Sequence, residues 1–112
     1  MNDIREIIIL IERANAQAIA GHIRDLIGVD TLKQLDAWNL TAPNSGLKFR
    51  VRNGGEINYV EITYDENSLY DIVLGTLSGV ADVLRDRHEV IDTINDIPED
   101  KLRDALRSRI KQ

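Results

Sequence analysis

The sequence predicts an α+β fold with a long N-terminal helix, an antiparallel meander of three or four strands and a C-terminal helix. Three observations predict it. Apolar residues recur at helical spacing from Asp3 to about Ile27. Strand-like segments follow one another between Gly46 and Leu77, and helical spacing returns after Pro98. A chain of 112 residues suits one hydrophobic core, so residues 1–112 are expected to form a single domain.

The first segment of helical spacing is longer than the sheet it could cover. Its apolar residues fall at positions 4, 7, 8, 11, 14, 18, 19, 23, 26 and 27, and Gly28 is a natural helix end. About 25 helical residues extend roughly 37 Å, which exceeds a strand of about six to eight residues. We therefore expect the helix to overhang the sheet and meet another copy, or to break near Ala20-Gly21.

The apolar run from Ile7 to Ile11 spreads over more than one face of this helix, which favours burial from two sides. A homodimer formed through Ile7, Ile8 and Ile11 would provide such burial. A two-sided contact within one chain is the alternative.

The segment Asp30–Leu40 admits two interpretations. Its leucines fit a short helix capped by Asp30, or a strand fragment followed by a turn. Trp38, the single tryptophan, is expected to anchor the core or an edge of the sheet. Thr41–Ser45, which contains a proline and an asparagine, is expected to be a loop.

The central hairpin has a register that can be derived. A two-residue loop at Gly54-Gly55 makes one face of the strand pair apolar and gives the other face a complementary charge pair. A slip by one residue would destroy this arrangement. The apolar pairs are Leu47–Ile62 and Phe49–Val60, and the polar pairs are Lys48–Glu61 and Arg50–Tyr59. Asp65–Ser68 is expected to form the second turn, before a third strand in which Tyr70, Ile72 and Leu74 alternate.

The pattern after Gly79 is divided between helix and strand. A short helical or irregular piece at 80–88 and a strand at about 89–95 account for it best. Pro98 then marks a helix start, and Glu99 can pair with Arg103 one turn later. The inward stripe of this last helix is Leu102, Ala105, Leu106 and Ile110.

Charge is distributed unevenly along the chain, whose net charge is −5. Residues 54–100 carry twelve acidic side chains against two arginines, whereas residues 101–112 carry five bases against one acid. An acidic middle disfavours nucleic acid as a partner and suits a basic protein surface. Solubility alone is the alternative account. The candidate partner-binding residues are Asp82, Asp86, Glu89 and Asp92.

No motif for catalysis, metal or cofactor binding stands out, so the chain is not expected to be an enzyme or to carry a cofactor. His22 and His88 are expected to be surface residues far apart. Lys48, Arg50 and Arg52 share one strand face beside Tyr59, a pattern that can bind single-stranded nucleic acid. A charge ladder between strands is the preferred interpretation.

From about Gly28 onward the sequence resembles a family of short uncharacterised proteins common in phage and other mobile genetic elements of bacteria. The resemblance rests on GLKFRV at 46–51, NYVEITYD at 58–65, LYDIVL at 69–74 and DIPEDKLRDAL at 96–106. It covers about three quarters of the chain and leaves most of the first helix outside. It implies phage origin and a sheet of three or four strands, without a mechanism.

The expected function is that of a small, non-enzymatic, phage-derived interaction protein. An acidic inhibitor of a host nucleic-acid-binding or defence protein fits this expectation. The alternative is a structural or assembly accessory protein that self-associates through the first helix. The absence of cysteine and of any apolar run of membrane length predicts a place in the host cytoplasm, away from membranes.

Overall fold

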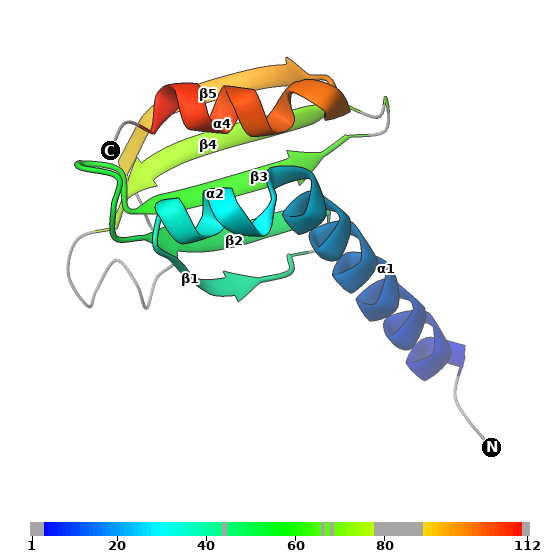
Figure 1. The fold of residues 1–112 in the computed structure, drawn as a ribbon. Coiled ribbons are helices and arrows are strands. Elements are labelled where there is room, and N and C mark those ends of the chain that lie inside the picture. Colours follow the sequence, from blue (N-terminus) through cyan, green and yellow to red (C-terminus); the bar gives the residue numbers. More distant parts are fainter. Residues whose placement is uncertain (1–3, 44, 66, 68, 78–88, 111–112) are drawn as a thin grey trace.

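The computed structural model describes residues 4–43, 45–65, 67, 69–77 and 89–110, with side chains from Ala16 onward. A five-stranded antiparallel sheet in the order β1-β2-β3-β4-β5 forms one layer, and the helices lie together on one of its faces (Figure 1). We call this covered face the inner face and the opposite one the outer face. The helical elements are α1 (Ile4–Ile27), α2 (Val29–Gln34), η1 (Glu99–Lys101) and α4 (Leu102–Arg109). The strands are β1 (Ala37–Thr41), β2 (Gly46–Val51), β3 (Tyr59–Tyr64), β4 (Tyr70–Thr76) and β5 (Glu89–Ile97).

The α+β class, the antiparallel meander and the C-terminal helix are confirmed, but the strand count is wrong. The segment Asp30–Leu40 forms both of the structures considered for it, α2 followed by β1. The sequence pattern of β1 is weak because the strand is short and its pairing with β2 shifts register between Trp38 and Thr41. Asn39 within this irregularity has a φ of 56°, which asparagine tolerates better than most residues.

The far edge strand, β5, corresponds to the strand expected at about 89–95. It pairs with β4 over Glu89–Ile97 with two register shifts, so it bulges away from a regular ladder. The helical or irregular piece expected at 80–88 lies outside the described residues.

The register of the β2–β3 hairpin is confirmed at every pair derived from the sequence. Its loop is wider than the expected two-residue turn, because the strands end at Val51 and Tyr59. Ile57 in this loop is buried within the core, and a turn is closed by a hydrogen bond from the Ile57 N–H to the Gly54 carbonyl. In this loop the burial of the Ile57 side chain stabilises the chain in place of further pairing between β2 and β3.

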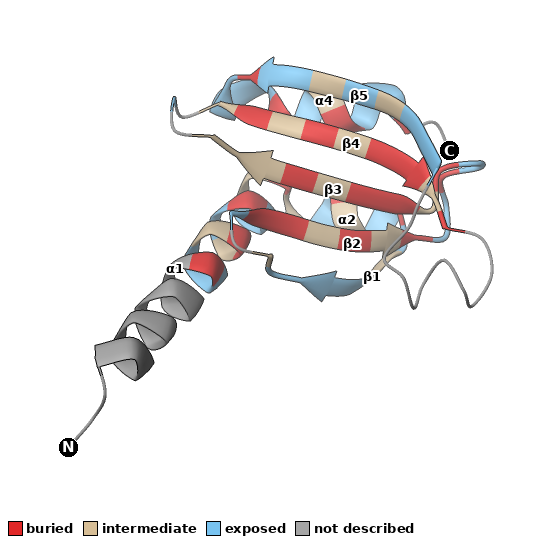
Figure 2. Cartoon of the chain, turned by 180° about the vertical axis from the view of Figure 1, so that it is seen from behind, coloured by how far each residue is buried: buried red, intermediate tan, exposed pale blue. Residues whose placement is uncertain are grey.

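The core lies between the inner face of the sheet and the helices. Side chains of β2, β3 and β4 alternate between buried and partly exposed, as Figure 2 shows. Ile23 and Ile27 of α1 and Leu102 and Leu106 of α4 are fully buried against this face. The stripe predicted for the C-terminal helix is thus confirmed.

The pairing expected within that helix is wrong. Glu99 bonds to His22 of α1, and the Nε–H of Arg103 donates to the carbonyl of Leu26 at 3.2 Å. The last carbonyl groups of a helix have no partner within the helix, so a cationic side chain such as that of Arg103 can donate a hydrogen bond to one of them. Both side chains therefore attach the C-terminal segment to α1 and do not pair with each other.

The N-terminal part of α1 extends beyond the sheet and the other helices in both views (Figures 1 and 2). Among the described residues, no helix combines the length and apolar character needed to cross a bilayer. The side chains of Ile7, Ile8 and Ile11 lie outside the described part, so self-association through them stays a prediction.

Two glycines make a matched test of the packing. A methyl group at Gly46 would overlap the backbone carbonyl of Ile62, whereas a methyl group at Gly21 of α1 would meet nothing within 4 Å. We expect Gly46→Ala to lower the free energy of unfolding by about 1–3 kcal/mol. Gly21→Ala should raise it by about 0.5–1 kcal/mol. Urea denaturation measures both, and equal effects of the two variants would contradict the arrangement of β2 and β3.

Candidate functional site

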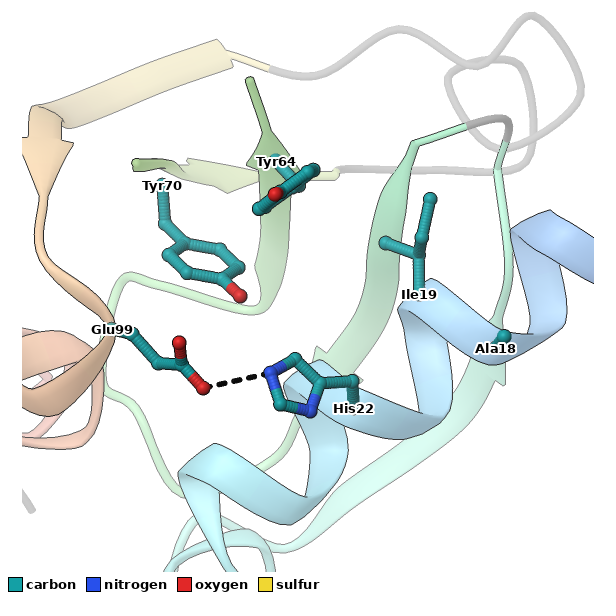
Figure 3. Close-up of a pocket in the computed structure, with 6 residues that line it drawn as sticks. All are labelled: Ala18, Ile19, His22, Tyr64, Tyr70 and Glu99. Atoms are coloured by element: carbon teal, nitrogen blue, oxygen red, sulfur yellow. Dashed lines mark hydrogen bonds and ion pairs between the residues drawn. The ribbon is translucent and has the colours of Figure 1, made fainter. Parts of the chain in front are cut away.

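A pocket of about 320 Å³ opens at one end of the sheet, between α1, η1 and the ends of β3 and β4 (Figure 3). This volume is near the small end of the range for ligand sites. Its lining residues are Ala18, Ile19, His22, Tyr64, Tyr70 and Glu99.

The two tyrosines are placed by the β3–β4 hairpin. Tyr64 ends β3 and Tyr70 begins β4, and they face each other as a cross-strand pair. Asp65 closes the turn between them, because its Oδ1 accepts hydrogen bonds from the N–H groups of Asn67 and Leu69. The two rings lie 5.3 Å apart at 57°, a tilted arrangement that is favourable for aromatic pairs.

His22 and Glu99 form the opposite side of the pocket. The His22 Nε2 and the Glu99 Oε1 are 2.8 Å apart, and each side chain is about half exposed (54% and 53%). His22 is therefore a surface residue, as expected, yet it contacts an element from the other end of the chain. One α-helical face carries Ile19 and His22 into the pocket, since residues three apart lie on the same side of a helix.

Tyr70 is the most deeply placed polar residue of the pocket. It is 2% exposed, and its hydroxyl points toward Glu99 and His22 (Figure 3). Within the described part of the chain, this hydroxyl has no hydrogen-bond partner. Burial raises the pKa of the Tyr70 hydroxyl, and the nearby charges of the Glu99 carboxylate and the Tyr64 hydroxyl raise it further. The hydroxyl is therefore neutral at physiological pH.

The six described lining residues offer groups that can hold a ligand. Glu99 supplies a negative charge, Tyr70 a free hydroxyl, and the tyrosine rings and Ile19 an apolar wall. Such an arrangement can bind and orient a ligand by non-covalent contacts.

Carboxylates follow one edge of the sheet, from Glu89 at the end away from the pocket to Glu99 at the pocket. We define the acidic edge as the carboxylates of β5, of the β3–β4 turn with the start of β4, and of η1. Its members are Asp65, Asp71, Glu89, Asp92, Asp96, Glu99 and Asp100.

Three carboxylates of the acidic edge form a tight group. Ligand oxygens of Asp65, Asp71 and Asp96 lie within 4.8 Å of one another. Carboxylate oxygens suit Ca²⁺ and Mg²⁺. Here they have a structural role, because Asp71 accepts a hydrogen bond from the Asp96 N–H at the bulge of β5, and Asp65 closes the turn.

The structure describes two of the four predicted partner-binding residues, Glu89 and Asp92. Glu89 is exposed at the start of β5, whereas Asp92 accepts a 2.7 Å hydrogen bond from Arg109 of the C-terminal helix. Asp82 and Asp86 lie outside the described residues. Glu89 and Asp92 thus lie on the same edge strand. Of these two, Asp92 forms an ion pair, and Glu89 forms none with a described residue.

The outer face carries a second cluster, which involves Trp38. The guanidinium carbons of Arg50 and Arg52 lie 4.8 and 4.5 Å from the centre of the Trp38 ring, within cation–π range. The Arg50 Nε is buried without a hydrogen-bond partner. Trp38 therefore lies on the edge strand β1, and an edge of the sheet was one of the two places expected for it.

The remaining residues of the basic stripe belong to a charge ladder. Lys48 lies opposite Glu61, and the Tyr59 hydroxyl donates a hydrogen bond to Glu61 at 3.2 Å. Tyr59 is itself buried, at 5% exposure. The register thus places Lys48 opposite Glu61, as a charge ladder requires, whereas Arg50 and Arg52 stack on Trp38.

The pocket could not be derived from the sequence. Its members come from four elements, and His22 and Glu99 are 77 residues apart in sequence. The available signal was the tyrosine pair at the two ends of the β3–β4 turn. No protein-family model, curated protein or solved structure matches the chain.

The raised pKa of Tyr70 predicts a dependence of stability on pH. Folding holds the proton on a hydroxyl whose ordinary pKa is 10.0, so the unfolded chain binds fewer protons once the pH exceeds that value. The free energy of unfolding should therefore fall above about pH 10, and more steeply in the wild type than in Tyr70→Phe. Urea denaturation of both proteins between pH 7 and 11 measures the difference. Parallel curves would contradict the burial of this hydroxyl.

Proposed function

We propose that the chain is a small, non-enzymatic interaction protein that binds a basic protein partner through its acidic edge. The single observation that supports this most directly is the chemistry of β5. It is an edge strand of nine residues that carries Glu89, Asp92 and Asp96 and no basic residue.

An acidic edge strand suits some partners and disfavours others. Within the described part of the chain β5 pairs with β4 alone, so its other side is open to a partner strand. Pairing of two copies of β5 would bring carboxylates close together, which is unfavourable. A partner with lysine or arginine side chains would meet complementary charge and would associate faster at low salt.

Phage origin, as the sequence resemblance implies, extends this proposal to an inhibitor. A nucleic-acid-binding host or defence protein has a basic surface made to bind phosphates. Carboxylates spaced along an edge strand would compete for that surface. We propose this class of host protein as the partner.

The test compares two sets of neutralising substitutions. The edge variant carries Glu89→Gln, Asp92→Asn and Asp96→Asn. The control variant, which removes the same charge elsewhere on the surface, carries Asp25→Asn, Asp30→Asn and Glu56→Gln. Asparagine suits position 96, where φ is 57°.

Tagged wild-type protein captures partners from bacterial lysate, and the affinity of each captured protein is then measured by calorimetry with all three proteins. We expect a basic partner whose affinity falls at least about tenfold for the edge variant and with rising salt. The control variant should bind like the wild type. Equal losses for both variants would mean that total charge, and not the acidic edge, determines binding.

Self-association through α1 is the second candidate function. The observation that favours it is the projection of the N-terminal part of α1 beyond the sheet (Figure 1). A dimer formed along this part of α1 would bury apolar surface that the sheet of one chain does not reach.

Light scattering measures the mass of the wild type and of a variant with Ile7→Lys and Ile11→Lys. Under this second function the wild type is a dimer or larger and the variant is a monomer of unchanged helix content. A wild-type protein that is monomeric at about 100 μM, a concentration well above the dissociation constant of a stable dimer, would refute it.

A further inference from the structure

We infer that the pocket between α1, η1 and the β3–β4 hairpin is a binding site for the guanidinium group of an arginine side chain from the partner. This inference rests on the proposed function, and it names the side chain that the acidic protein recognises. The six lining residues named above belong to the described part of the chain.

The first step is the unused polar group. Tyr70 is 2% exposed and its hydroxyl faces the pocket without a hydrogen-bond partner among the described residues. Although the residue as a whole is buried, its hydroxyl is not one of the sealed polar atoms of the described chain, so a ligand in the pocket can reach it. The Tyr70 oxygen can accept a hydrogen bond from an N–H group.

The second step is charge. Glu99 places a carboxylate at the pocket, and one of its oxygens, Oε1, contacts His22 at 2.8 Å. Glu99 is the only carboxylate among the six described lining residues. A carboxylate at the wall of a pocket favours a cation and opposes an anion.

The third step is shape. The rings of Tyr64 and Tyr70 lie 5.3 Å apart at 57° and present aromatic surface beside the carboxylate. A planar guanidinium can stack on an aromatic ring while its N–H groups reach separate acceptors. Here the acceptors are the Glu99 carboxylate and the Tyr70 hydroxyl. The aliphatic stem of an arginine would lie against Ile19 and Ala18.

Other ligand classes fit these groups less well. A metal ion would find one carboxylate and one imidazole, and that imidazole already contacts the carboxylate. A lysine ammonium is compact and strongly hydrated, and it uses the aromatic surface less fully than a guanidinium does.

The test uses small probes on the full chain. N-acetyl-arginine amide is titrated into isotope-labelled protein, and amide resonances are followed by NMR. We expect shifts that centre on His22, Tyr70 and Glu99, with a dissociation constant in the range of about 1–10 mM, as is usual for one side chain. N-acetyl-citrulline amide, which has nearly the same shape and no charge, should bind at least about tenfold more weakly.

Substitutions locate the binding to the pocket. Glu99→Gln should weaken the arginine probe at least tenfold, and Tyr70→Phe several-fold. The matched control is Asp100→Asn, which removes the same charge from the neighbouring exposed residue and should leave the affinity unchanged within about twofold. Circular dichroism and thermal unfolding confirm that each variant is folded before titration.

Three results would overturn the inference: equal binding of the arginine and citrulline probes, equal losses for Glu99→Gln and Asp100→Asn, or shifts that lie away from the pocket. A lysine probe that binds as tightly as the arginine probe would refute the guanidinium assignment.

The pocket and the proposed function can fail separately. The edge variant should still bind the arginine probe, because its substitutions lie outside the pocket lining. If the edge variant loses the partner and the probe does not bind, the pocket inference fails and the proposed function stands. If the probe binds and the edge variant keeps the partner, the proposed function fails.

Discussion

The arrangement of this protein depends on a small group of aliphatic side chains from which water is fully excluded. Ile23 and Ile27 of α1 and Leu102 and Leu106 of α4 have no exposed surface. Each such burial contributes about 1.5–3 kcal/mol before the loss of chain entropy is counted. These four side chains fix both helices on the inner face of the sheet. The pocket exists because α1 and η1 are held against the end of that sheet.

The sequence predicted the structure best where a residue pattern was compatible with a single arrangement of the chain. The β2–β3 register followed from alternation, because a slip would expose Phe49 and bury Lys48. The stripe Leu102–Ile110 was equally clear. β1 was expected only as one of two alternatives for Asp30–Leu40, because an irregularity at Asn39 interrupts the alternation of its side chains. The pocket was missed because its members meet only through tertiary packing, which no local pattern encodes.

The charged and polar side chains of the structure fall into two groups, those that bond to the backbone and those that do not. Asp65, Asp71 and Arg103 satisfy backbone groups at a turn, a bulge and a helix end, so their charges are part of the architecture. Glu89 and the Tyr70 hydroxyl have no such role within the described chain. An acidic composition alone could not separate these groups. The hydrogen bonds distinguish the two groups. Glu89 lies on the edge strand β5, and Tyr70 lies in the pocket.

The contacts of His22 with Glu99 and of Arg103 with Leu26 each join residues 77 positions apart. During synthesis, the hairpins of the meander can pair as they leave the ribosome, because their partners are close in sequence. α1 emerges first but cannot complete its packing until the C-terminal segment has been made. α1, which is translated before the strands of the meander, is thus among the last of these elements to be fixed in place. A ribosome-bound chain that ends before η1 would present the apolar face of α1 to chaperones.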